Sequence, residues 1–151
     1  MKFRIGRKSM VFLASLGLTL FTVGGTTAQQ PLPNPVLVFT APEFFENGGK
    51  QWIRYRYNVE NFNAYPKEMF AAAPELPPCG NNTKASRTWV DIYAQSGKRL
   101  NGFCAFGSPA DLNSVWFALE SDVIPPSWVY LELTDRKTNT KYKSALSETT
   151  Q

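Results

Sequence analysis

The chain has 151 residues, of which 16 are lysine or arginine, 12 are aspartate or glutamate and none is histidine. This length predicts a single domain. The lack of histidine removes the most frequent general base, the most frequent metal ligand and every serine–histidine or cysteine–histidine nucleophile pair. Most hydrolase mechanisms are removed with it, and we expect no catalytic residue, no metal ion and no cofactor.

The first 28 residues have the layout of a secretory signal peptide. Four basic side chains within the first eight residues precede an apolar run at 10–23, and small residues follow up to Ala28. The run is shorter than the roughly 20 apolar residues that a transmembrane helix needs. We expect export by a Sec-type signal, cleavage after Ala28 and a soluble protein that is periplasmic or secreted, without stable membrane insertion.

Cleavage after Ala28 would leave 123 residues, in which 12 basic and 12 acidic side chains balance. The excess positive charge of the whole chain therefore belongs to the expected signal peptide. Nucleic acids and anionic membranes attract a net basic surface. We expect no nucleic-acid partner, and we expect the partner to be a protein or a glycan of unknown identity.

The two cysteines, Cys79 and Cys104, would reach a compartment where disulfides persist. They lack the Cys-x-x-Cys spacing of a redox pair, and no other soft metal ligand accompanies them. We expect a structural disulfide. The closed loop of about 25 residues predicts a stabilisation of about 3.5 kcal/mol in the chain-entropy treatment.

Residues 29–35 contain three prolines and predict a stiff tether before the domain. After them, apolar and polar residues alternate with period two in short segments bounded by Gly, Pro, Asn or Asp, which is typical of strands. The first is expected to stop at Ala41-Pro42, before a turn at Asn47-Gly48-Gly49, and the polar residues 147–151 are expected to be disordered. The predicted strands are 35–40, 51–60, 88–94, 99–106, 113–120, 127–134 and 140–146.

Residues 61–87 are too long for an ordinary connection and contain four prolines. Within them, residues 66–73 predict two helical turns, because proline is favoured at the first helical position and Pro74 would end the helix. Met69 and Phe70 would then cover one end of the core. On the strand that carries Cys104, Gly102 predicts a β-bulge.

Seven short strands without a long helix predict an all-β fold, an antiparallel immunoglobulin-like sandwich over 36–146 with one long Pro-rich loop. Because Cys79 lies in that loop rather than in a strand, the antibody-type arrangement is not expected, and a fibronectin type III-like sandwich is the closer description. An eight-stranded barrel stays open as an alternative, since a period of two does not distinguish stacking from closure.

Several strings in the chain resemble those of a family of small exported bacterial proteins described as fibronectin type III-like. The most specific are Leu76-Pro77-Pro78-Cys79-Gly80 and Gly102-Phe103-Cys104-Ala105, and residues 65–74, 86–93 and 112–117 add to them. The resemblance covers about 36–146 and implies the sandwich and a pairing of the two cysteines. It implies no activity and no binding residues.

Three predicted strands carry aromatic and charged side chains on the face opposite their aliphatic one. If these strands are neighbours, one face would present rings and charged cross-strand pairs, as a binding surface or a sugar-binding platform. The alternatives are that residues 61–87 cover this face or that the rings form ordinary surface ladders. The candidates are Trp52, Arg54, Arg56, Trp89, Asp91, Tyr93, Trp128, Tyr130 and Glu132.

Paired carboxylates could hydrolyse glycosides without histidine. The candidate pairs are Glu43 with Glu46, Asp91 with Glu132, and Glu120 with Asp122, and none has a second supporting signal. The sequence therefore favours a non-catalytic exported β-sandwich, a protein-interaction or envelope-associated module. A carbohydrate-binding module is the alternative, and a small carboxylate-based hydrolase is less favoured.

Signal processing is the first testable expectation. Thr26 and Ala28 place small residues at the two positions that a signal peptidase reads, so the mature chain should begin at or near Gln29. N-terminal sequencing of protein from the exported fraction checks this. Recovery from the membrane pellet alone, with Met1 intact, would indicate an anchored protein instead.

Overall fold

The computed structural model describes residues 31–79, 85–105 and 107–149. The chain divides into two compact units, Met1–Gln30 and Pro31–Gln151. The first unit includes the expected signal peptide and lies outside the described residues. The fold described below is that of the second unit.

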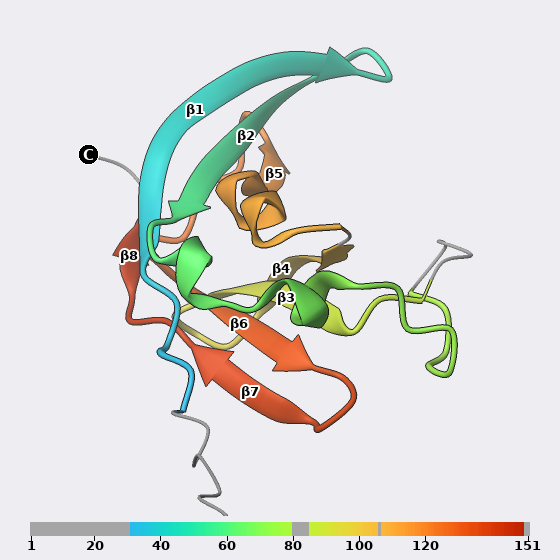
Figure 1. Cartoon of the computed structure of the whole chain (residues 1–151). Coiled ribbons are helices and arrows are strands. Elements are labelled where there is room, and N and C mark those ends of the chain that lie inside the picture. The colour runs from blue at the N-terminus through green and yellow to red at the C-terminus, as the bar shows by residue number, and fades with distance from the viewer. Residues whose placement is uncertain (1–30, 80–84, 106, 150–151) are drawn as a thin grey trace, which may run out of the picture. The chain divides into compact units, whose positions relative to one another are not determined.

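The described part of the chain contains eight strands and three short 3-10 helices, and no α-helix (Figure 1). In chain order the elements are β1 (Leu37–Asn47), β2 (Lys50–Val59), η1 (Phe62–Ala64), η2 (Lys67–Phe70), β3 (Thr88–Ala94), β4 (Arg99–Ala105), η3 (Pro109–Asn113), β5 (Val115–Glu120), β6 (Trp128–Asp135), β7 (Thr140–Lys143) and β8 (Ser147–Glu148).

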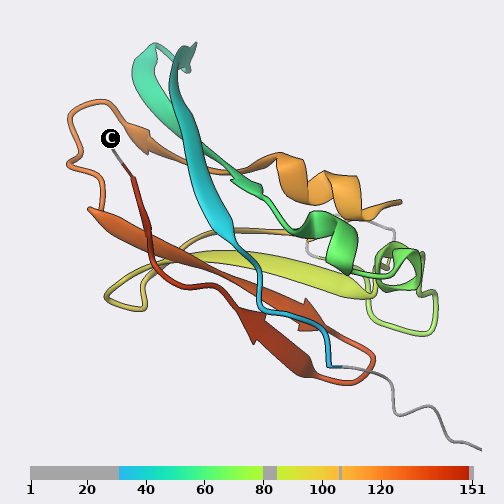
Figure 2. The same ribbon diagram turned by 60° about the vertical axis from the view of Figure 1, so that its left-hand side comes forward.

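The strands form two antiparallel sheets that face each other (Figure 2). One sheet has the order β1-β2-β5, and the other has the order β4-β3-β6-β7, with β8 also pairing with β6. The predicted β-sandwich is thus confirmed, and the barrel alternative is wrong. Because the fourth strand pairs with the third, the order differs from the ABED and CFG sheets of immunoglobulin constant domains.

The core between the sheets consists of the aliphatic and aromatic residues that the two-residue repeat selects. Each of these side chains gains about 1.5 to 3 kcal/mol from full burial, and the rings of Tyr55 and Phe117 stack at 5.0 Å between centroids. The residues that alternate with them must therefore lie on the outside of each sheet. The fully buried members include Tyr57, Val59, Val90, Ile92, Val115, Phe117, Val129, Leu131 and Leu133.

Strand β1 does not stop at Ala41-Pro42 as expected but continues to Asn47. Strand β1 is the edge strand of its sheet and pairs with β2 on one side only. On its open side no partner strand needs the N–H that a proline lacks, so Pro42 is tolerated there. The register shifts between Phe39 and Ala41, which marks a β-bulge. At this bulge the Thr40 hydroxyl donates a hydrogen bond of 2.8 Å to the Arg56 carbonyl, which joins the side chain to β2.

The turn between β1 and β2 is formed by Gly48 and Gly49, as the sequence predicts. Both residues have positive φ, at 59° and 74°. A two-residue hairpin turn with two positive φ angles is of type I′, which glycine adopts without steric cost. The turn sets the register that places Phe45 opposite Trp52 and Phe44 opposite Ile53.

Residues 61–79 and 85–87, the described parts of the Pro-rich segment, form less helix than the sequence predicts. The expected two turns are reduced to η2, a single 3-10 turn, because Ala71 is already extended and Ala72 pairs with Ser86 in an isolated bridge. Met69 and Phe70 are nevertheless buried at the end of the core, as predicted. The segment therefore closes one end of the sandwich.

The end of the chain is more ordered than expected. Ser147 and Glu148 form β8, opposite Val129 and Trp128 of β6, and Thr149 is buried. The prediction of a disordered tail is thus wrong for 147–149, while 150–151 lie outside the described residues. The physical reason is that β7 pairs only the second half of β6, so the first half offers unpaired backbone groups that β8 satisfies.

Residues 31–35 of the expected tether lie against the domain. The Tyr65 hydroxyl donates to the Pro33 carbonyl, and the Asn61 side-chain amide donates to the Asn34 carbonyl, both at 2.8 Å. Leu32 also packs against the hydrophobic core. The backbone carbonyls of Pro33 and Asn34 thus hold this segment against the domain.

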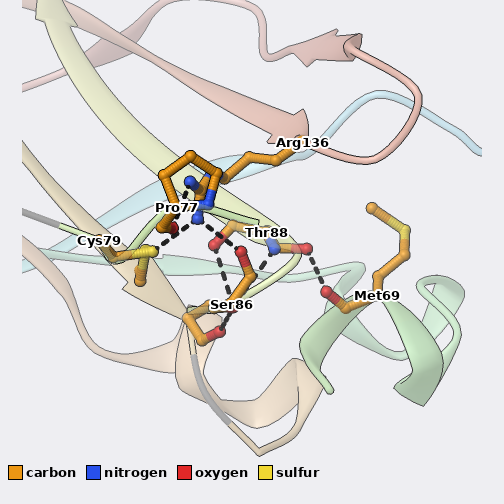
Figure 3. Close-up of a disulfide and its surroundings, with 8 residues drawn as sticks. Met69, Pro77, Cys79, Ser86, Thr88 and Arg136 are labelled. Carbon is orange, nitrogen blue, oxygen red and sulfur yellow. Dashed lines mark hydrogen bonds between the residues drawn. A yellow bond between two sulfur atoms is a disulfide. The ribbon is translucent and has the colours of Figure 1, made fainter. Parts of the chain in front are cut away.

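The predicted disulfide between Cys79 and Cys104 is present (Figure 3). Beside it, the Arg136 guanidinium donates to the Cys79 Sγ at 2.9 Å and to the carbonyls of Pro77 and Ser86 at 2.8 Å. Arg136 follows β6 directly. The Pro-rich segment is therefore joined to the second sheet by one covalent bond and by one guanidinium group.

A second arginine, Arg87, joins the residue before β3 to the end of β6. Arg87 forms a salt bridge with Asp135, with 2.6 Å between Nη2 and Oδ2. Burial of the Asp135 carboxyl raises its pKa, but hydrogen bonds from Arg87, Thr138 and the Lys137 N–H outweigh burial and hold the pKa below its ordinary value. The buried carboxylate thus stays ionised and anchors the residues that lead into β3.

The disulfide should stabilise the segment more than the sheets. Replacing both cysteines, as Cys79→Ser with Cys104→Ser, should lower the free energy of unfolding by about 2 to 4 kcal/mol. Chemical denaturation measures this loss, and hydrogen exchange should show residues 61–87 loosening before the sandwich melts. Two titratable thiols in the natively exported protein would contradict the bond, and unchanged exchange over 61–87 in the double variant would contradict the tethering role.

Candidate functional site

The nine residues that the sequence singles out lie on outer surfaces, but on two different sheets. Strand β2 pairs with β1 and β5, whereas β3 and β6 pair with each other. Trp52, Arg54 and Arg56 therefore lie on one sheet, and the six candidates of β3 and β6 lie on the other. The nine residues do not form a single face.

On the five-stranded sheet, the candidates of β3 and β6 face each other across the strand pair. Tyr93 lies opposite Tyr130, and their rings stack with centroids 5.2 Å apart. Asp91 lies opposite Glu132, which places two carboxylates on neighbouring strands. At the start of β6, Trp128 is 38% exposed, whereas the other three tryptophans are half-buried.

Each of these two carboxylates has a basic partner. The Arg99 Nε lies 2.6 Å from the Asp91 Oδ1, and the Lys141 Nζ lies 2.7 Å from the Glu132 Oε1. Cations also cover the rings: the Arg99 guanidinium lies over Trp89 at 5.3 Å, and the Lys143 ammonium lies over Tyr130 at 3.8 Å. The alternative of a surface ladder that satisfies its own charges describes this face best.

Gly102 has a different role from the expected bulge. It pairs regularly with Asp91, and the irregularity in β4 falls between the partners of Ile92 and Tyr93. A Cβ atom at Gly102 would overlap the Arg99 guanidinium and the Asp91 carboxylate. Because Gly102 has no side chain, the Arg99 guanidinium can pass over it and reach the Asp91 carboxylate on the neighbouring strand β3.

The outer face of the three-stranded sheet is built in the same way. The Arg54 guanidinium lies between the Phe45 and Trp116 rings, at 4.8 Å and 4.7 Å from their centroids. Glu43 accepts hydrogen bonds from Arg54 and Arg56. The bond from Arg56 and the charge of both arginines outweigh desolvation and lower the pKa of the Glu43 carboxyl. This carboxylate therefore serves as a counter-ion for two arginines.

These contacts bear on the carboxylate pairs that the sequence offers for hydrolysis. A glycosidase needs one carboxyl with a raised pKa as its general acid. Glu43 has a lowered pKa, Asp91 and Glu132 each have a basic partner, and Glu120 lies 2.7 Å from the Lys50 Nζ.

Within the described ranges, no group of three or more His, Cys, Asp or Glu side chains could hold a metal ion.

A surface that the sequence did not single out lies at the end of the sandwich where β2 begins and β5 ends. Among large apolar side chains of the described residues, Ile124 and Phe44 are the most exposed, at 91% and 70%. Val123, next to Ile124, is also exposed. We call Phe44, Val123 and Ile124 the apolar end.

The hairpin that carries Phe44 is attached to the connection that carries Val123 and Ile124. The Ser121 N–H donates to the Gln51 carbonyl at 2.9 Å, and Lys50 forms a salt bridge with Glu120. Figure 2 shows the β1–β2 hairpin and the β5–β6 connection at the same end of the molecule. Two segments that are distant in sequence are thus joined at the end of the sandwich where these three apolar side chains are exposed.

Part of this surface had a detectable sequence signal. Two glycines between Phe44-Phe45 and Trp52-Ile53 are the pattern of a two-residue hairpin, which extends the first strand past Pro42. Because the first strand was expected to stop at Ala41-Pro42, Phe44 and Phe45 were not assigned to a strand. Nothing in the sequence distinguishes Ile124, which precedes two prolines, from a core residue.

Comparison of the chain with protein-family models, with curated proteins and with solved structures gives no match. The resemblance to a family of small exported fibronectin type III-like proteins thus stays an expectation. In the part of the chain that the structure describes, no helix has the length and hydropathy needed to cross a membrane.

The role of Gly102 can be tested by substitution. Gly102→Ala should displace Arg99 from Asp91, which is buried, and lower the free energy of unfolding by about 1 kcal/mol. Chemical denaturation of the single and double variants forms a cycle with Arg99→Ala. If the cost of Gly102→Ala stays the same when Arg99 is already alanine, the space is needed for another reason.

Proposed function

We propose that this chain is a non-catalytic, exported β-sandwich module that binds a partner protein through the apolar end. One observation carries the proposal: Phe44 and Ile124 leave most of their side-chain surface in water. Large apolar side chains that gather on a surface are typical of interaction sites. Covering them gains free energy in proportion to the apolar area removed from water.

The two outer faces are weaker candidates for a protein interface. Their carboxylates hold nearby arginines and lysines, and guanidinium or ammonium groups lie on their rings. A partner would have to displace these groups or desolvate them. The apolar end has no comparable cost, because Phe44, Val123 and Ile124 carry no charge.

Carbohydrate binding is the second candidate, and Trp128 is the residue that favours it. Trp128 is exposed. It lies on β6 two residues before Tyr130, whose ring stacks on that of Tyr93. A sugar ring could stack on Trp128, whereas Trp89 and Trp116 each have one face covered by a guanidinium group. Binding of oligosaccharides should then change tryptophan fluorescence, and Trp128→Ala should abolish the change.

Export is supported by the disulfide and by the signal-like start of the chain. Disulfides persist in the periplasm and outside the cell, where thiols are not kept reduced. The proposed site of action is therefore the periplasm, the cell surface or the medium.

Site-specific photo-crosslinking tests the proposal. A photoreactive amino acid at Phe44 or at Ile124, in protein exported by its native host, should give adducts of the same mass. The matched control is position 138, an exposed residue in the β6–β7 turn, which should give none. Ile124→Ser should weaken the adduct from position 44 severalfold, and Phe44→Ser should weaken the adduct from position 124. Neither substitution should unfold the domain, since both side chains are exposed.

Two results would contradict the proposal. Equal adducts from position 138 would show that the crosslinks do not depend on the apolar end. Steady turnover of a polysaccharide, ester or peptide by the purified protein would show that the module is catalytic.

A further inference from the structure

A groove lies at the opposite end of the sandwich from the apolar end, where β2 ends and β5 begins. It has a volume of about 440 Å³ and runs between the segment after β2 and the segment before β5. Its lining includes Phe62, Tyr65, Pro66 and Pro109, with Asn63, Lys67 and Ser108 as polar members. A volume of this size lies within the range of clefts that hold small ligands.

The walls of the groove are held in place by contacts outside it. The Gly107 N–H donates to the Phe70 carbonyl at 2.9 Å, which joins the two segments. Tyr65 is fixed by its hydrogen bond to Pro33 and by edge-to-face packing against Tyr142. Pro66 and Pro109 have restricted φ angles. The groove is therefore formed before any ligand arrives.

The charge of the groove is asymmetric. Lys67 is exposed and is the one charged residue in the lining, which contains no acid. Within the described ranges Lys67 has no ion-pair partner, as is also true of Lys98, Lys137 and Lys143, but Lys67 alone among these lysines lines the groove. An apolar floor beside an unpaired ammonium group complements an apolar ligand that carries one negative charge.

Asn63 narrows the class of ligand further. Asn63 is exposed and is one of the lining residues, and an asparagine amide offers both a donor and an acceptor, which match a peptide group. A simple hydrocarbon acid would leave this amide unused. The combined chemistry is that of the last residue of a peptide, with an apolar side chain, a terminal carboxylate and a preceding peptide bond.

We propose that this groove binds the carboxyl-terminal residue of a peptide. The apolar side chain packs on Phe62, Pro66 and Pro109, and the carboxylate pairs with the Lys67 ammonium. Asn63 hydrogen-bonds the preceding peptide group. This site is independent of the apolar end, so it stands whether or not a protein binds there.

Amide NMR of the purified exported protein tests this inference with defined probes. The probes are acetyl-Gly-Leu-Phe with a free carboxylate, the same peptide as a carboxyl-terminal amide, and phenylacetate. The acid peptide should shift resonances of 62–67 and 108–110 and bind about fivefold more tightly than the amide, which is the effect expected of one exposed charge pair.

Matched lysine variants separate the groove from general charge. Lys67→Gln should remove the difference between acid and amide, whereas Lys137→Gln, an exposed lysine in the β6–β7 turn, should leave it unchanged. Equal binding of acid and amide to the unmodified protein, or shifts centred elsewhere, would overturn the inference. Phenylacetate binding as tightly as the acid peptide would overturn the assignment to peptides in favour of small acids.

These results are separable from those at the apolar end. Failure of the peptide titration leaves crosslinking from Phe44 and Ile124 unaffected, and the reverse also holds.

Discussion

The structure depends on the two-residue repeat of its central strands, β2, β3, β5 and β6. Because a pleated strand sends alternate side chains to opposite sides, burying the aliphatic set between two sheets leaves the alternate residues no other place than the outside. In this chain most of the alternate residues are large rings and charged groups. Each outer face therefore combines rings, guanidinium groups and carboxylates in contact with one another, on β2 around Arg54 and on β3 around Asp91.

Where a repeat or a covalent bond determines the outcome, the sequence was a good guide. The bounds of β3 agree with those predicted, and the core faces of the central strands and the pairing of Cys79 with Cys104 are confirmed. The strand order was not predictable from local patterns, because it depends on contacts between distant segments. For that reason the nine candidate residues appeared as one face, although β2 pairs with neither β3 nor β6.

The remaining differences arise where tertiary contacts override local signals. Proline normally ends a strand, but at the edge of a sheet Pro42 does not need to donate. A polar tail normally frays, but Ser147 and Glu148 find unpaired backbone on β6. The groove beside Lys67 and the apolar end each combine two segments that are distant in sequence, so neither could be read from one stretch of residues.

The position of Arg136 also makes the surroundings of the disulfide depend on the second sheet. Its guanidinium reaches the Cys79 sulfur only when β6 is in place, because Arg136 follows that strand directly. A substitution that displaces the end of β6 would therefore also release residues 77–79 from Arg136, even where the disulfide stays intact.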